Sequence, residues 1–519
     1  MNSQIMTPAH WKHLEDHHHG ICLPLSSITT ANSCGIGEYL DLIPLIKWLP
    51  KTGFDLIQLL PINDTGADPS PYMGVSSCAL HPIYLSLRNL PNHSCVPGFA
   101  EKINKLSSLN GLERVDYAQV LDIKLSALSL YFDHLLPEIE KKSEFHTFVK
   151  ANSFWLTSYS IFKALKIAHK GIAWWDWEKS AKFRTMDDDA LSNEIMRWRA
   201  VQYLCFSQFK KVKKTADKHG ILIKGDVPFL INKDSSDVWA NPDLFDRRLS
   251  VGSPPDEYSR DGQHWGFPTY KWHNHRKNDF HWWKSRLQVQ EQLYHIYRLD
   301  HIVGFFRLWA IPPKKNPKDG ILIPERPEEW KSLGEEVLTN IVRSTTMLPI
   351  GEELGNIPTI VKESIHTLGI PAVKILRWER RYDGDRSFIH PSFYSPETLS
   401  TLTTHDTPIM TQWWSKHQAA SQRLAHELNL PWQETLPPST FFDLLTFSHN
   451  AGSRFHVNMF NELLTLFPEL SWESADKERI NIPGTTLPTN WTYRFKKPLE
   501  EICSHKGLLK NLQTLSSLT

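Results

Sequence analysis

Short apolar runs alternate with longer amphipathic segments along most of the chain. Each run is too short for a helix and stops at a polar or turn residue. The runs cover residues 21–25, 55–62, 221–231, 297–306, 347–355, 371–378 and 399–406. Their hydrophobicity is continuous rather than alternating, which is typical of strands buried on both faces of a parallel sheet.

Helical periodicity fills several of the intervals between these runs. From Leu191, apolar side chains recur every three or four residues as far as Val212, which predicts an amphipathic helix. A second helix, over Trp282–Ile296, leads directly into the run at 297–306. The alternation of strand and helix predicts an α/β fold.

Two segments interrupt this rhythm within an otherwise single unit of residues 1–519. Residues 99–215 contain helical patches and predict a mainly helical insertion subdomain. Residues 232–276 are rich in Pro, Gly, Asp and aromatic residues, too irregular for regular elements and too aromatic for a mere linker. Long irregular loops in compact domains usually carry function, so we expect an active-site loop insertion there.

Four acidic residues lie in or just after separate apolar runs: Asp226, Asp300, Glu352 and Asp406. In a (β/α)8 barrel the carboxyl ends of all strands meet at one face, which holds the active site. Carboxyl groups brought together repel, so their pKa values separate and one group stays protonated while another is ionised. Cleavage of a glycosidic bond requires this division of roles. A single acid in such a position is more often structural, but four are harder to dismiss.

Neighbouring side chains support this interpretation. Arg298 lies two residues before Asp300, so both side chains point to one face of a strand, where a guanidinium can orient the carboxylate. His301 and His405 adjoin two of the acids, and imidazoles can hydrogen-bond sugar hydroxyls, although a lone histidine is usually structural.

Composition narrows the function classes. The chain has 519 residues with 58 Lys and Arg against 57 Asp and Glu, a net charge of +1 that argues against nucleic-acid and membrane-surface partners. Twenty Trp residues supply rings that can stack on sugars, although core packing is the commoner role. We find no long apolar segment and no secretory signal, and we expect a cytoplasmic protein.

Other chemistries have little support. Six scattered cysteines contain no C-x-x-C pair, and the usual phosphate-loop, zinc-protease and serine-hydrolase motifs do not occur. We therefore expect no cofactor and no metal. The histidines at positions 13 and 17–19 are interpreted as part of a mobile terminus.

Sequence blocks between about residues 20 and 410 resemble those of the 4-alpha-glucanotransferases, or amylomaltases, in the same order. The blocks are LPLSSITTANSCGIGEYLDL, PSPYMGVSSCALHPIYL, KGDVPFLINKDSSDVWANPDLF, GSPPDEYSRDGQHWGFPTYKW, RLDH, GEELG and THDT. The resemblance implies a (β/α)8 TIM barrel with inserted subdomains and no C-terminal β-sandwich. It implies that Asp300 is the nucleophile, Glu352 the general acid/base and Asp406 the transition-state stabiliser.

The same resemblance implies the substrate and its contacts. The donors and acceptors would be α-1,4-glucans such as maltooligosaccharides, including glycogen-derived ones, joined by a retaining double displacement. Arg298, His301 and His405 would line the donor sugar, and Asp226 would be a supporting acid. Aromatic residues Tyr72 and Trp265 match positions near the scissile bond, and Trp378 is a further stacking candidate.

Five positions depart from the family pattern. Val303 stands in place of an Arg, Glu353 of an Asp, Thr407 of an Asn, and Met73 with Gly74 of a Gln-Ser pair. No catalytic position is changed, so these departures bear on substrate preference and rate rather than on the class of reaction.

Two rival functions remain open from the sequence. A hydrolase of the α-amylase kind has the same three acids but passes the intermediate to water. A non-catalytic glucan-binding protein would suit the tryptophan content, but it does not explain why all three acids are present.

Overall fold

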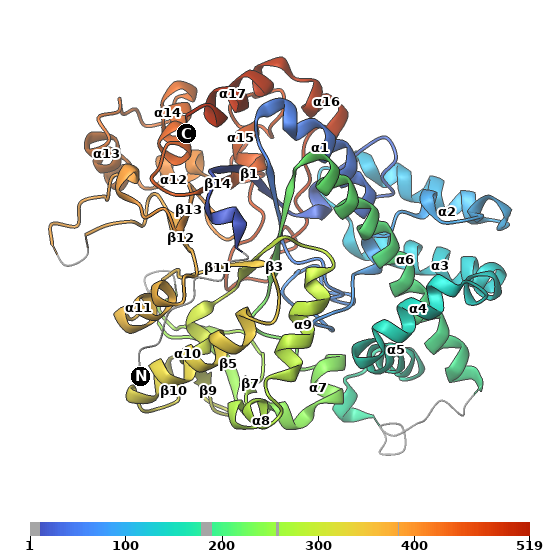
Figure 1. Ribbon diagram of the computed structural model, residues 1–519. Helices are drawn as coiled ribbons and strands as arrows, with labels where there is room; N and C mark the ends of the chain where they lie inside the picture. The colour runs from blue at the N-terminus through green and yellow to red at the C-terminus, as the bar shows by residue number, and fades with distance from the viewer. Residues whose placement is uncertain (1–10, 178–188, 256–258, 356, 382–383, 519) are drawn as a thin grey trace.

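A closed barrel forms the centre of the molecule (Figure 1). The computed structural model describes residues 11–177, 189–255, 259–355, 357–381 and 384–518. Within them, eight parallel strands are neighbours in the order β1-β2-β3-β8-β11-β12-β13-β14 and back to β1. Their bounds are β1 His18–Leu23, β2 Leu56–Leu59, β3 Leu222–Val227, β8 Ile296–Leu299, β11 Leu348–Gly351, β12 Ala372–Ile375, β13 Thr398–Thr401 and β14 Phe455–Met459. The predicted (β/α)8 barrel is confirmed.

Seven of the strands coincide with the predicted apolar runs, and β14 was missed. Its sequence is Phe455–Met459, FHVNM, in which His456 and Asn458 interrupt the apolar pattern. Both side chains are fully buried, yet both are hydrogen-bonded to Ser448: His456 Nδ1 lies 3.0 Å from the Ser448 carbonyl, and Asn458 Nδ2 donates to Ser448 Oγ over 3.1 Å. A buried polar side chain with a partner is tolerated in a strand, but it hides the strand from a search for apolar runs.

Helices surround the barrel (Figure 1). They include α1 (Leu42–Trp48), α6 (Asp189–His219), α9 (His281–Glu291), α10 (Glu328–Val342), α11 (Thr359–Thr367), α12 (Met410–Lys416), α13 (Gln418–Glu427) and α14 (Pro438–His449). The predicted helix from Leu191 is α6, and the second predicted helix ends at Glu291, short of β8. After β14 the described elements are helices α15 (Phe460–Leu464), α16 (Leu499–Ser504) and α17 (Lys506–Ser516), so the described part has no C-terminal β-sandwich.

Residues 99–215 are helical where the structure describes them, with residues 178–188 outside that part. Helices α3 (Tyr117–Glu140), α4 (Ser143–Ala151) and α5 (Ser153–Ala168) lie beside α6, and α2 (Phe99–Ser107) packs against α3 (Figure 1). Since α6 continues past residue 215 to His219, the helix joins this group to the barrel. The division into subdomains stays a prediction.

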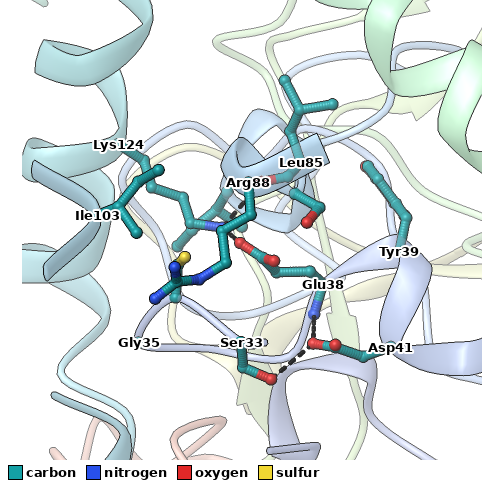
Figure 2. A network of polar contacts seen from close by, with 12 residues as sticks. Ser33, Gly35, Glu38, Tyr39, Asp41, Leu85, Arg88, Ile103 and Lys124 are labelled. Carbon is teal, nitrogen blue, oxygen red and sulfur yellow. Dashed lines mark hydrogen bonds and ion pairs between the residues drawn. The ribbon is translucent and has the colours of Figure 1, made fainter. Parts of the chain in front are cut away.

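An ion pair anchors α3 to the loop that follows β1 (Figure 2). Lys124 Nζ lies 2.6 Å from Glu38 Oε1 and donates to the Leu85 carbonyl over 3.0 Å, and both charged side chains are fully buried. Asp41 in turn accepts hydrogen bonds from Ser33 Oγ and from the Glu38 backbone N–H. Such a pair holds the two segments together because breaking it leaves a charge in the interior.

The segment 232–276 is more regular than its composition indicates. It contains α7 (Ser236–Ala240), β4 (Phe245–Asp246), β5 (Ser250–Ser253), β6 (Gln263–His264), β7 (Thr269–Tyr270) and α8 (Trp272–Lys277), with 256–258 outside the described residues. Strand β5 pairs with β9 (Leu308–Ile311), which pairs with β10 (Ile321–Ile323). Strand β4 pairs with β7 and β5 with β6 inside the segment, but each strand is only two to four residues long, too short for an alternating pattern to reveal it.

The interpretation of the early histidines as a mobile terminus is wrong. His18 and His19 lie in β1 and are 6% and 4% exposed. His18 Nδ1 lies 2.6 Å from Asp55 Oδ2, and His19 Nδ1 lies 2.8 Å from His449 Nδ1. Partners on other elements therefore fix this part of the chain. Separately, none of the helices in the described ranges is long and apolar enough to cross a bilayer.

Candidate active site

The four predicted acids gather at the carboxyl end of the barrel. Asp226 lies within β3, Asp300 and Glu352 directly follow β8 and β11, and Asp406 follows β13 after a short turn. Asp226 is the neighbour of Arg298 in the register between β3 and β8. Barrel closure thus brings together side chains that are far apart in the sequence.

Arg298 joins three of the acids. Its Nη1 donates to both oxygens of Asp226, over 2.9 and 2.8 Å, and to Asp300 Oδ1 over 2.9 Å. Its Nη2 lies 3.0 Å from Glu352 Oε2. The spacing of two residues between Arg298 and Asp300 places both side chains on one face, as predicted. Several carboxyl groups bound to one guanidinium keep its pKa well above the ordinary value, despite the opposing effect of burial.

Glu352 and Asp406 have opposite electrostatic environments. Burial raises the pKa of Glu352 to about 7, and the charge of Asp300 adds to this although Arg298 opposes it. For Asp406, burial would also raise the pKa, but His405 and the amide of Asn481 outweigh that effect and lower it to about 2. Near neutral pH one carboxyl group therefore retains a proton while the other is ionised.

Backbone N–H groups bind two of the carboxylates at the carboxyl end of the barrel, those of Glu352 and Asp300. The His301 N–H donates to Glu352 Oε2 over 2.7 Å, from a residue with a left-handed φ of 47°. The Phe229 N–H donates to Asp300 Oδ2 over 3.4 Å. A strained backbone at His301 is typical of a position that a functional geometry requires.

Asn481 is a site residue that the sequence did not reveal. Its Nδ2 donates to Asp406 Oδ1 over 2.7 Å, and its backbone N–H donates to the His405 carbonyl over 3.2 Å. Arg479 Nη2 donates to the Asp406 carbonyl over 3.1 Å. Both residues lie beyond β14 in a segment that has neither strand nor helix periodicity and matches none of the family blocks, so no local signal marks them.

Aromatic side chains flank the carboxylates. The Tyr72 hydroxyl donates to Asp226 Oδ2 over 2.8 Å, and its ring stacks on His405 with centroids 5.4 Å apart. Trp491, also missed from the sequence, lies 5.6 Å from each of these rings. Trp265 packs edge-on against His301 at 5.2 Å. These rings form two walls of the kind that binds sugars.

Trp378 has different neighbours from the other predicted aromatic residues. It follows β12 and is half-buried, and the Arg377 guanidinium lies 5.8 Å from its ring centroid. Arg377 Nη1 donates to the Pro408 carbonyl over 3.1 Å, two residues beyond Asp406. Through Arg377, the structure connects Trp378 with the turn that carries Asp406.

The departures from the family pattern occupy well-defined surroundings. Glu353 is paired with Lys374, whose Nζ lies 2.7 Å from Glu353 Oε1. Val303 is buried in the turn after His301, and Thr407 Oγ1 accepts a hydrogen bond from the Thr404 N–H over 2.9 Å. Met73 is half-buried against the core. No described cluster of three or more His, Cys, Asp or Glu side chains has the arrangement of a metal site.

Comparison with known proteins agrees with this geometry. The model of a family described as 4-alpha-glucanotransferase matches residues 23–500. A 4-alpha-glucanotransferase of Chlamydia pneumoniae is 43% identical over 492 residues, which are 94% of this chain and 93% of that relative. The corresponding protein of Chlamydia caviae is 42% identical over 96% of this chain and 94% of its own length. The chain belongs to the 4-alpha-glucanotransferase family.

Solved structures share the fold of this 4-alpha-glucanotransferase family member. The amylomaltase of Streptococcus agalactiae in complex with acarbose superposes with a TM-score of 0.81 at 24% identity, over 97% of this chain and 99% of that one. The amylomaltase of Corynebacterium glutamicum gives 0.83 at 20% identity, over 99% of this chain and 77% of that one. The family assignment makes the chain an enzyme of glycosyl transfer among α-1,4-glucans.

Proposed function

We propose that Asp300, Glu352 and Asp406 transfer a segment of an α-1,4-glucan to the 4-hydroxyl of an acceptor glucose or glucan. The observation that carries this proposal is the shared guanidinium of Arg298, which holds Asp300 and Glu352 side by side. Two carboxyl groups that lie close together suit a retaining mechanism, because no water has to fit between them in the first step.

The first step forms a covalent glucosyl-enzyme. Asp300 attacks the anomeric carbon, and Glu352 gives its proton to the departing glycosidic oxygen as that bond breaks. The raised pKa of Glu352, about 7, keeps this proton available near neutral pH. Asp406, with its pKa lowered to about 2, stays ionised and stabilises the positive charge that develops on the sugar ring.

The second step reverses the first with a new partner. Glu352, now a carboxylate, removes the proton of the acceptor's 4-hydroxyl while that oxygen attacks the anomeric carbon and Asp300 leaves. An acceptor glucan must outcompete water, so it has to be held at a high effective concentration. The rings of Tyr72, Trp265 and Trp491 supply stacking surfaces for this purpose.

The remaining predicted residues support the donor sugar and the architecture. Arg298, His301, His405 and Trp378 contact or frame the donor, and Asp226 holds Arg298 and Tyr72 in position. We keep the division into a barrel of residues 1–519, a helical insertion at 99–215 and an active-site loop insertion at 232–276. We also propose a cytoplasmic location, which the six free thiols support.

Incubation of the purified protein with maltotriose alone tests the reaction. We expect glucose together with a ladder of longer maltodextrins, resolved by chain length. Asp300→Asn should reduce the rate by at least about ten-thousandfold because the nucleophile is lost. Asp122→Asn, which changes an exposed acid on α3, should leave the rate unchanged.

The product pattern separates the alternatives. Glucose and maltose in hydrolytic proportion, without longer products, would favour an amylase-type hydrolase. An unchanged substrate would favour a glucan-binding protein. A ladder that persists in Asp300→Asn would contradict the assignment of the nucleophile while leaving the transferase reaction intact.

A further inference from the structure

A fully buried lysine lies beneath the catalytic carboxylates. Lys224 is on β3, two residues before Asp226, so both side chains point into the barrel. Its Nζ donates to Gln58 Oε1, on the neighbouring strand β2, over 2.8 Å. Among the described residues no carboxylate forms an ion pair with it, in contrast to the buried Lys124, which has Glu38 as a direct partner (Figure 2).

The surroundings of Lys224 connect it with the catalytic residues. Lys224 and Gln58 line a cavity of about 30 Å³ together with Arg298, Glu352, His405 and Cys22. These residues come from, or directly follow, strands β1, β2, β3, β8, β11 and β13, so the cavity lies on the barrel axis. The rest of the wall is largely apolar, with Val373, Leu399 and Val457 among its residues, and a cavity of this size has room for about one water molecule bound to the polar groups.

The charges above the cavity are unequal. Once Glu352 has given up its proton, four carboxylates, those of Asp226, Asp300, Glu352 and Asp406, gather against the guanidinium of Arg298 and the imidazole of His405. A third cation in the interior reduces this imbalance, and in a medium of low dielectric its effect reaches groups it does not touch. Burial without a paired carboxylate lowers the pKa of Lys224 to about 7, so the ammonium is costly to keep at this position.

We propose that Lys224 is a positioning residue for the acid/base Glu352. Gln58 holds its ammonium one layer below Arg298. There the positive charge offsets the negative charge of the carboxylate cluster and stabilises the ionised form of Glu352. This inference rests on the proposed role of Glu352. The ionised form is the one that must accept a proton from the acceptor hydroxyl in the second step. Lys224 acts on Glu352 by long-range electrostatic interaction inside the barrel, and it does not contact the sugar.

The pH profile of kcat/KM for maltotriose tests the proposal. Lys224→Met keeps the length of the side chain and removes the charge, in an interior that tolerates a thioether. Removal of a nearby positive charge raises the pKa of a carboxyl group, so the basic limb, where Glu352 loses its proton, should move to higher pH. The shift should be at most about one unit, because the pKa of Lys224 is itself lowered to about 7 and the ammonium is only partly charged in this range. Lys224→Arg should return the limb towards its wild-type position because it restores the charge.

Lys124→Met is the matched control. It also removes a fully buried ammonium, but it breaks the Lys124–Glu38 pair of Figure 2, so we expect a lower Tm and an unmoved pH profile. If Lys124→Met moves the basic limb as far as Lys224→Met does, the shift reflects general destabilisation and the proposal is overturned. An unmoved limb in a folded Lys224→Met enzyme overturns it as well.

Two further variants keep the outcomes distinct. Where Lys224→Met does not fold, Lys224→Gln provides the same loss of charge with a side chain that can still bond Gln58, and the same shift is expected. Glu352→Gln tests the underlying role separately: retained wild-type activity would refute Glu352 as acid/base. Lost activity in Glu352→Gln with an unmoved limb in Lys224→Met would refute only the inference about Lys224.

Discussion

The two ends of the barrel bury polar side chains in opposite ways. At the carboxyl end, Arg298 contacts Asp226, Asp300 and Glu352 within hydrogen-bonding distance, so charged groups are retained and compensated. The amino end buries a cluster of three imidazoles, those of His19, His449 and His456, beside His18, whose Nδ1 lies 2.6 Å from Asp55 Oδ2. The carboxyl end thus gathers several carboxyl groups around one guanidinium, whereas the cluster of three histidines packs neutral rings against one another.

Ring stacking and burial keep the cluster of three histidines neutral. The ring of His19 stacks on those of His449 and His456, with centroids 5.1 and 4.8 Å apart. Burial lowers the pKa of His19 to about 3 and that of His456 to about 4, and it lowers the pKa of His449 well below the ordinary value. Protonation of one ring would place a charge against its neighbours, so the cluster acts as packing material in its neutral form.

The largest effect is expected from removing the central charge of the carboxyl end. Arg298→Met leaves Asp226, Asp300 and Glu352 without their shared cation, and the carboxyl groups should repel one another and take up protons. We expect kcat/KM for maltotriose to fall by at least about a thousandfold, or about 4 kcal/mol. A fall of less than tenfold would refute the central role of Arg298. Arg276→Met, at an exposed pair with Glu336, should have no effect.

A smaller effect is expected at Asn481, which touches a single acid. Asn481→Ala removes the amide donor that lies 2.7 Å from Asp406 Oδ1, so the pKa of Asp406 should rise from about 2. We expect kcat to fall by about tenfold to a hundredfold with little change in KM, since the role proposed for Asp406 is in the transition state.

Asn490→Ala controls for the shape of the loop that carries Asn481. Asn490 Nδ2 donates to the Thr485 carbonyl over 3.0 Å, so it holds the same loop without touching Asp406. An equal loss of kcat in both variants would assign the effect to the loop rather than to the hydrogen bond.

The sequence predicted the two ends unequally, for physical reasons. At the carboxyl end, two local patterns made the prediction possible. Acidic residues follow apolar runs, and Arg298 and Asp300 are two residues apart, so both patterns depend only on the geometry of a single strand. At the amino end, His19 and His456 interrupt the apolar pattern by which a strand is recognised, because stacking partners satisfy them only in the folded barrel. Asn481 was missed for a related reason: its contact with Asp406 joins two loops that no local pattern connects.

The smallest effect concerns the amino end and its response to acid. His19, His449 and His456 take up protons in the unfolded chain near pH 6.5, whereas their folded pKa values are lowered, to about 3 for His19 and about 4 for His456. The unfolded state therefore binds more protons between about pH 6.5 and 4, and the free energy of unfolding falls as the pH falls through this window. Each histidine contributes up to about 1.4 kcal/mol per pH unit, and His449→Gln should remove one such contribution.

Urea unfolding of the wild type and His449→Gln at pH 7 and pH 5 measures this difference in the free energy of unfolding. Equal losses of stability in the wild type and His449→Gln would show that the imidazoles are not what makes the amino end sensitive to acid, and the contrast between the two ends would then rest on geometry alone.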